Sequence, residues 1–145
     1  MEIFGPPEQV YVERDRYDGP RSGIADIGGM PHRFQSLFDE AENQYLRTFM
    51  VWPIAPSVLD LEIKQWRIFV EWNNRFESGE ADTESHPGQG GLNARWDELE
   101  ALLKPDRAMI PSDARQARAE LHPIDREERY AASGPDYQLA WAVAG

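Results

Sequence analysis

The sequence contains no cysteine among its 145 residues, and basic residues are scarce. The absence of cysteine excludes disulfide bonds, thiolate metal ligands and a cysteine nucleophile. With 15 lysines and arginines against 26 aspartates and glutamates, the net charge is −11, so the basic surface that nucleic acids and anionic membranes require is missing. No apolar run approaches the ~20 residues that span a bilayer, and the acidic, proline-interrupted N-terminus is unlike a signal peptide. These absences favour a cytoplasmic protein.

Apolar and aromatic residues are plentiful enough for one hydrophobic core. Hydrophobic residues make up 41% of the chain and aromatic residues 11%. A chain of this length buries one sizeable core but is too short for two ordinary ones. We therefore predict a single domain over residues 1–145.

The stretch YDGPRSGIADIGGMPHRF, residues 17–34, predicts a turn followed by a β-hairpin. Glycine reaches positive φ without steric cost, so Gly28-Gly29 suits a two-residue hairpin turn. Side chains alternate between the two faces of a strand, and the turn sets their register. The predicted cross-strand pairs are Ile27 with Met30, Ala25 with His32, and Gly23 with Phe34.

The remaining pattern predicts further strands and two helices. Alternating or continuous apolar residues favour strands at 8–14, 45–54, 117–122 and 136–144. Helical propensity keeps a helix open as the alternative for 113–122. Apolar residues at helical spacing predict one helix over about 58–77, with Ser57 and Asp60 as a capping box, and another from Asn93 to Pro105. The sequence thus predicts an α+β fold, with a mostly antiparallel sheet of four to six strands and two helices packed on one face.

The longer helix carries a stripe of Trp66, Phe69, Trp72 and Phe76. Such a stripe is typical of a buried core. Two alternatives remain open. One is a tryptophan left exposed in a ligand or partner pocket, and the other is a homodimer face formed by the helix aromatics.

Negative charge is concentrated in residues 77–100, which hold seven acidic residues and one arginine, a net charge of −6. Within this region, 79–91 predicts a flexible acidic loop rich in glycine. Complementary charge speeds the encounter of protein partners, so Glu80, Asp82 and Glu84 are candidates for contact with a basic protein. A solvated surface that serves only solubility would have the same acidic residues.

Arg21-Ser22-Gly23 is a candidate anion site, because a guanidinium, a hydroxyl and a backbone N–H could converge there. The motif lacks the spacing and the following helix of a phosphate-binding P-loop. The structural alternative is that Arg21 pairs with an acidic neighbour such as Asp18 or Asp39 and braces the corner.

The three histidines do not form a metal motif. His32, His86 and Asp39 could be combined into a zinc site, but no helical ligand pair such as H-E-x-x-H occurs, so we predict no metal and no cofactor. A hydrolase built on Ser22, His32 and Asp39 is disfavoured, because the predicted register places Ser22 and His32 on opposite faces of the hairpin. His86, in a loop, is the histidine best placed to act as an acid or base.

Several blocks of the sequence together resemble a family of small uncharacterised bacterial proteins, a domain of unknown function. The blocks are Tyr17–Gly23, Pro31–Phe34 with Phe38-Asp39, Trp66–Phe76, His86-Pro87, Arg95–Leu103 and Leu139–Trp141. The resemblance implies a bacterial cytosolic protein and supports a strand at 117–122. It supplies no catalytic residues.

These observations leave three functional hypotheses. The first is a non-enzymatic protein-binding domain of the inhibitor or immunity type, favoured by the acidic segment and the lack of a catalytic signature. The second is a small hydrolase or anionic-ligand-binding protein that uses Arg21, His32 and His86. The third is a structural role as a homodimer.

Overall fold

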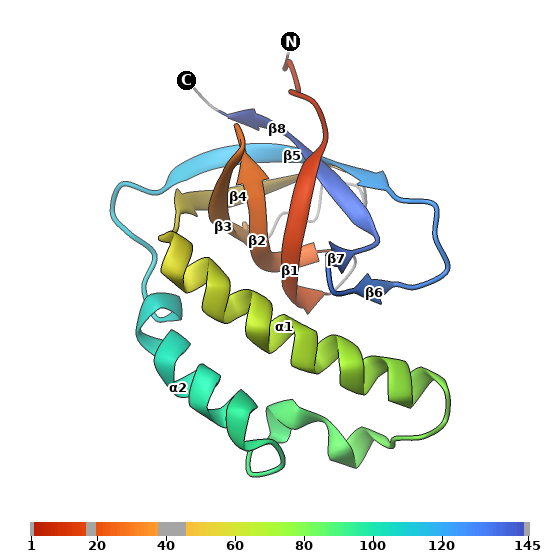
Figure 1. Ribbon diagram of the computed structural model, residues 1–145. Coiled ribbons are helices and arrows are strands. Elements are labelled where there is room, and N and C mark those ends of the chain that lie inside the picture. The colour runs from red at the N-terminus through yellow and green to blue at the C-terminus, as the bar shows by residue number, and fades with distance from the viewer. Residues whose placement is uncertain (1, 17–19, 38–45, 144–145) are drawn as a thin grey trace.

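The computed structural model describes residues 2–16, 20–37 and 46–143. Within these ranges, six antiparallel strands form a closed barrel in the order β1-β2-β3-β4-β5-β8 (Figure 1). The strands are β1 (Glu8–Arg16), β2 (Pro20–Ile27), β3 (Met30–Ser36), β4 (Leu46–Pro53), β5 (Arg115–Pro123) and β8 (Tyr137–Val143). Two helices, α1 (Pro56–Glu77) and α2 (Ala94–Arg107), connect β4 to β5. The predicted α+β class and antiparallel sheet are confirmed.

The barrel interior is filled by apolar side chains from every strand. Three aromatic rings lie at its centre, with centroid distances of 5.1 Å between Phe34 and Phe49, 5.7 Å between Phe49 and Trp141, and 6.0 Å between Phe34 and Trp141. Each of these side chains is at most 4% exposed. Closure also pairs both edges of the sheet, which protects their backbone groups from other chains.

The predicted hairpin register is confirmed at all three pairs, as β2 and β3 pair antiparallel in that register. Gly28 and Gly29 have φ values of 61° and 78°, which L side chains rarely adopt. At Gly23 a Cβ would lie 2.1 Å from the carbonyl oxygen of Val12, so the close approach of β1 requires glycine. Residues 17–19, which hold most of the predicted turn, lie outside the described residues.

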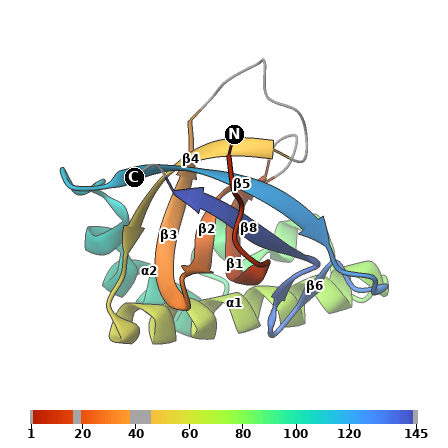
Figure 2. The same ribbon diagram turned by 90° about the horizontal axis from the view of Figure 1, so that it is seen from above.

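Helix α1 crosses the outer surface of the barrel, and α2 packs against α1 (Figures 1 and 2). Trp66 and Val70 of α1 form a buried apolar cluster with Val12 of β1 and Ile24 of β2. Of the predicted stripe, Trp66 lies in this cluster and Phe69 packs against it, where side chains on β1 and β2 point outward. The prediction is wrong for Phe76, which is 36% exposed and stacks on Trp72 beyond the barrel contact.

The ends of both helices differ from the prediction. No capping box at Ser57 forms, because α1 begins at Pro56 after Ala55, with no side-chain hydrogen bond at the cap. Proline supplies the helical φ at this first position and has no N–H that needs a partner. In α2 the predicted Asn93 cap is confirmed, since its Oδ1 accepts a 2.9 Å hydrogen bond from the Trp96 N–H. The helix continues past Pro105 to Arg107.

The segment predicted as a loop at 79–91 contains two short 3-10 turns, η1 (Thr83–Ser85) and η2 (Pro87–Gln89). The strand predicted at 117–122 is confirmed, because it lies within β5, which pairs with β4 over 115–120 and with β8 over 117–123. The strand predicted at 136–144 is confirmed over Tyr137–Val143, and residue 144 lies outside the described residues. A two-stranded ribbon, β6 (Tyr130–Ala131) with β7 (Gly134–Pro135), precedes β8. None of the helices in the described ranges is both long and apolar enough to cross a membrane.

Candidate functional site: an arginine cleft beside an aromatic pocket

Four arginines from separate elements line one cleft of about 460 Å³ where the barrel faces the end of α2. Arg14 comes from β1, Arg21 from β2, Arg33 from β3 and Arg107 from α2. The uncharged polar residues Ser22, Gln35 and Ser36 complete its polar lining, and no acidic residue is among the described residues that line it. We call this site the arginine cleft. Its composition is opposite to that of the chain as a whole, whose net charge is −11.

A buried carboxylate holds two of these arginines in place. Glu62 of α1 is 1% exposed, and its Oε2 lies 2.7 Å from Arg33 Nη1. Its other oxygen, Oε1, lies 2.5 Å from Arg107 Nη2. The side chains of the two arginines are only 5% and 8% exposed. Glu62 of α1 therefore connects Arg33 of β3 with Arg107 at the end of α2.

Further acidic groups surround the same arginines on the side of the helices. Asp106 accepts a 2.8 Å hydrogen bond from Arg33 Nε, and Glu100 accepts one of 2.8 Å from Arg107 Nη1. Gln65 accepts from Arg107 Nη2 at 2.6 Å and donates to Glu100 at 2.9 Å. The network fixes both guanidinium groups before any ligand arrives.

The electrostatic effects on Glu62 are large and opposed. Burial alone would raise its pKa, but the hydrogen bond and charge of Arg107, together with Arg33, outweigh burial and hold the pKa below its ordinary value. Glu100 behaves in the same way, because bonds from Gln65 and Arg107 outweigh its burial and lower its pKa. Both carboxylates are therefore ionised at neutral pH, so the arginines remain paired on that side.

One donor of the network has no acceptor. Arg33 Nη2 is buried and makes no hydrogen bond to any of the described residues. Leaving a buried charged donor without a partner costs ~1–3 kcal/mol or more, so native proteins rarely retain one without a reason.

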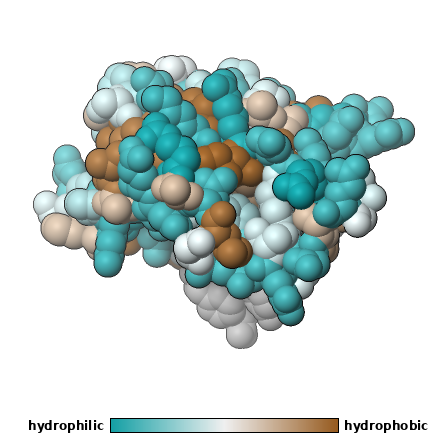
Figure 3. Space-filling model, turned by 60° about the horizontal axis from the view of Figure 1, so that its bottom comes forward, coloured by the Kyte–Doolittle hydropathy of each residue, from teal (hydrophilic) through white to brown (hydrophobic). Residues whose placement is uncertain are grey.

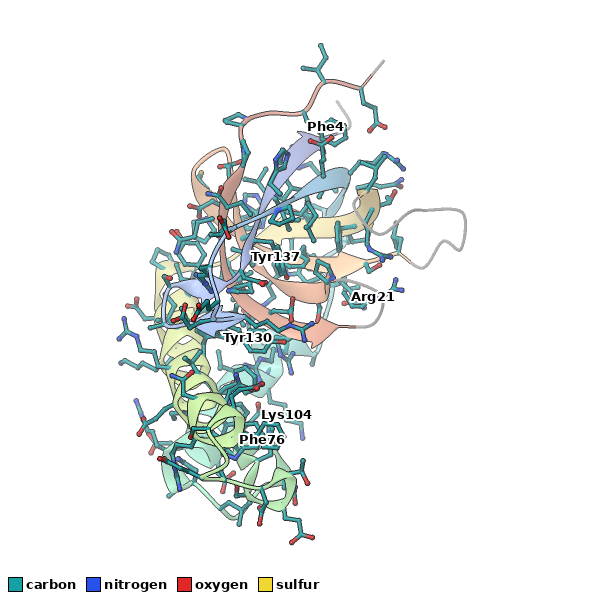
Figure 4. The ribbon with its side chains drawn as sticks, turned by 90° about the vertical axis from the view of Figure 1, so that its right-hand side faces the viewer. Phe4, Arg21, Phe76, Lys104, Tyr130 and Tyr137 are labelled. Atoms are coloured by element: carbon teal, nitrogen blue, oxygen red, sulfur yellow. The ribbon has the colours of Figure 1, made fainter. Side chains whose placement is uncertain are left out.

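Basic side chains continue from the cleft along α2. A neighbouring hollow of about 620 Å³ is lined by Arg14, Lys104 and Arg107 together with Glu100. In Figure 4, Arg21 lies at the edge of the barrel and Lys104 lies on α2 below it. The cleft therefore has a partly basic approach.

A second pocket, of about 290 Å³, lies between α1, α2 and β1 and shares Arg14 and Arg107 with the arginine cleft. We call it the aromatic pocket. Four aromatic residues line it: Trp66, Phe69, Trp96 and Tyr130. Figure 4 shows Tyr130 between the barrel and α1.

The predicted ligand-binding residues are divided between these places. Arg21 and Ser22 line the arginine cleft, where Arg21 Nη1 donates a 3.2 Å hydrogen bond to Ser36 Oγ. His86 lines the aromatic pocket instead. His32 is 6% exposed, and its Nδ1 lies 2.7 Å from the Met30 carbonyl oxygen. In the described part of the chain, Arg21 and His86 therefore line different cavities, and His32 lines neither the arginine cleft nor the aromatic pocket.

The other predicted sites also have definite places. Ser22 pairs with Gln35 and His32 with Ala25 in the hairpin, while Asp18 and Asp39 lie outside the described residues. Among the described residues, no group of three histidine, aspartate or glutamate side chains could hold a metal ion.

The proposed partner-binding carboxylates Glu80, Asp82 and Glu84 are exposed. Asp82 also has a local role, since its Oδ1 accepts a 3.0 Å hydrogen bond from the Ser85 N–H at the start of η1.

Sequence reasoning did not identify Arg14, Arg33, Glu62 or Arg107 as site residues. One signal was available for Glu62, because it stands four residues before Trp66 and therefore on the buried face of α1. A glutamate on a buried helical face needs a cationic partner. The identity of that partner depended on the topology.

Comparisons with protein-family models, with curated proteins and with solved structures found no match.

Proposed function

We propose that the protein binds a small anionic ligand, a carboxylate or a phosphate, in the arginine cleft. The observation that carries the proposal is that four arginines, Arg14, Arg21, Arg33 and Arg107, line one cleft with no acidic residue among the described residues of its lining. Arginine binds such anions well because its planar group offers several N–H donors in a fixed geometry.

The ion pairs behind the cleft support this function. The acidic partners of Arg33 bind its Nε and Nη1 and do not bind its Nη2. Arg107 is likewise held by Glu62 and Glu100 on the side of the helices. Guanidinium groups fixed in this way lose little further freedom when a ligand binds, which favours affinity.

Thermal unfolding in the presence of anions tests the proposal. A ligand that binds only the folded state stabilises it by RT ln(1 + [L]/Kd), so phosphate, sulfate, acetate or citrate should raise the melting temperature above that in sodium chloride of equal ionic strength. Arg21→Gln should remove most of this increase, because it deletes one charge from the cleft. Arg67→Gln is the matched control, since Arg67 is exposed on α1 and does not line the cleft.

Equal melting temperatures in all these salts would contradict the proposal. So would an increase that Arg21→Gln and Arg67→Gln reduce to the same extent, because the increase would then come from the general exclusion of such anions from the protein surface and not from binding in the cleft.

A second candidate function is contact with a basic protein through the acidic segment 77–100, as an inhibitor or immunity-type domain would make. The observation that favours it is an apolar surface next to the exposed carboxylates. Phe76 is 36% exposed and stacks on Trp72 at 5.2 Å, and Leu92 is 56% exposed. Figure 3 shows apolar residues in brown gathered between hydrophilic ones on the underside of the molecule. Protein interfaces commonly combine an apolar centre with a charged rim.

Neutralising the acidic rim tests this candidate. The triple variant Glu80→Gln, Asp82→Asn, Glu84→Gln should slow association with a basic partner captured from the source cells, and it should reduce the salt dependence of the rate. The variant Asp125→Asn, Glu127→Gln, Glu128→Gln removes three exposed charges elsewhere and is the control. Equal association rates for the two variants would exclude the acidic segment as the contact.

A further inference from the structure

We infer that the ligand of the arginine cleft carries a planar aromatic group, and that this group is held in the aromatic pocket while the anion meets the arginines. The inference rests on the proposed function and specifies the class of ligand as an aromatic carboxylate or an aromatic phosphate. Its basis is that Arg14 and Arg107 line both cavities, so a ligand held at these side chains is adjacent to both.

The lining of the aromatic pocket is suited to a flat apolar group. The rings of Trp66, Phe69 and Tyr130 surround one another, with centroid distances of 5.1 to 5.5 Å. Trp66 and Tyr130 meet edge to face, as do Phe69 and Tyr130, and all three residues line the pocket, where edge-to-face and offset stacked contacts with a further ring are the favoured geometries. The volume of about 290 Å³ is near the lower end for small-molecule sites and suits one or two fused rings.

The polar groups around these rings mostly have partners already. Trp66 Nε1 donates to the Ala131 carbonyl oxygen at 2.7 Å. The carboxylate of Glu13 accepts from the hydroxyl groups of Tyr130 at 3.1 Å and Tyr137 at 2.6 Å. Because these groups are satisfied, an apolar ring can cover them without leaving a donor unpaired.

His86 adds a neutral polar group to the pocket. Burial lowers its pKa, and its Nδ1 accepts a 2.9 Å hydrogen bond from the Gly88 N–H. A neutral imidazole that accepts at Nδ1 carries its proton on Nε2. The pocket thus holds an uncharged histidine at neutral pH.

An organic cation is a poorer occupant, although aromatic residues and Glu13, Glu62 and Glu100 also line the pocket. Glu62 and Glu100 already pair with Arg107, and Glu13 accepts from two tyrosines. Arg14 and Arg107 would repel a cation at the boundary with the cleft. The charges therefore favour a ligand whose anionic end is directed toward these arginines.

Titration of the intact chain with three matched probes tests the inference, with binding measured by calorimetry and by two-dimensional NMR. 2-Naphthoate carries both the ring and the anion, acetate carries the anion alone, and 2-naphthamide carries the ring without the charge. We expect 2-naphthoate to bind at least ten times more tightly than either of the other probes.

Variants separate the two halves of the site. Phe69→Leu keeps an apolar side chain and removes a ring, so it should weaken 2-naphthoate about tenfold and leave acetate unchanged. Arg21→Gln should weaken both anions. Trp96→Leu provides a second test of the pocket, and circular dichroism confirms that each variant is folded.

The outcomes distinguish this inference from the proposed function. If acetate and 2-naphthoate bind equally, the aromatic pocket has no part in recognition and the inference is wrong, while anion binding stands. If 2-naphthamide binds as tightly as 2-naphthoate, binding of the ring does not require a negative charge that meets the arginines. A single ligand across both cavities is then excluded. If none of the three probes binds, the inference is wrong, and the proposed function fails as well if inorganic phosphate does not bind.

Discussion

The inside of the barrel is filled by apolar side chains. In contrast, charged and aromatic side chains line the arginine cleft and the aromatic pocket, where the barrel meets the helices. Inside, Phe34, Phe49 and Trp141 pack ring against ring. Among the described residues of this cluster, Trp141 Nε1 is the only buried side-chain polar atom without a hydrogen-bond partner. Outside, Glu62 is as deeply buried as Phe34 but lies between two arginines. The first region stabilises the fold, and the second holds polar groups in positions suited to a ligand.

The largest loss of stability is expected inside the barrel. Phe34→Ala should lower the free energy of unfolding by ~3–5 kcal/mol, because it leaves a cavity that the rigid strands cannot close. Denaturant unfolding at neutral pH measures the change. A loss below ~1 kcal/mol would mean that the barrel interior can rearrange, and the contrast between the two regions would disappear.

A somewhat smaller loss is expected at the buried carboxylate. Glu62→Gln should cost ~3 kcal/mol, because it removes the charge that compensates two buried arginines. The double variant Glu62→Gln, Arg33→Gln should lose less than the sum of the two single changes, since the pair is then removed together. Strict additivity in the same denaturant experiment would show that the two side chains do not depend on each other.

Acid should weaken the region of the helices before the barrel interior. The folded state holds the pKa of Glu62 and Glu100 below their ordinary value of 4.5. A depressed carboxyl pKa gives stability that is present above the unfolded pKa and is lost as the pH falls below about 4.5, through the folded pKa. Unfolding free energies measured from pH 7 to pH 3 should therefore decline less steeply for Glu62→Gln than for the natural sequence. Parallel profiles would exclude Glu62 as a source of the decline.

The smallest effect is expected on the exposed acidic segment. Glu80→Gln with Glu84→Gln should change the free energy of unfolding by no more than ~0.5 kcal/mol, because exposed charges contribute little to folding. Asp82→Ala should cost more, since its side chain caps η1. Equal effects of these variants on the melting temperature would show that the cap is not needed.

Much of the barrel could be predicted because its determinants are local. The Gly28-Gly29 turn sets the register of β2 and β3, and alternation over 117–122 correctly outweighed the helical propensity of that stretch. The helix boundaries were less predictable. Helix α1 begins at Pro56 and lacks the expected capping box at Ser57. Helix α2 continues past Pro105, which lies in its last turn, where a missing N–H removes only one backbone hydrogen bond.

The candidate site was only partly predictable, because its residues are brought together by topology. Arg21 and Ser22 were identified from their own short motif and do line the cleft. Arg33 and Arg107 are 74 positions apart and are brought together by Glu62 on a third element and by the pairing of Arg33 with Asp106. Neither arginine belongs to a local pattern that would distinguish it from a solvated surface residue. The sequence therefore indicated part of the arginine cleft without its depth or its buried partners.

The most direct test of the account follows the side-chain N–H signals of arginine by NMR while inorganic phosphate is added. Arg33 and Arg21 line the cleft, whereas Arg67 is exposed on α1 and provides the internal reference. The account predicts that the Arg33 and Arg21 signals shift along a saturating curve with one common dissociation constant, while the Arg67 signal does not saturate. Small linear shifts of equal size at all three arginines would contradict it, because phosphate would then be acting only through ionic strength.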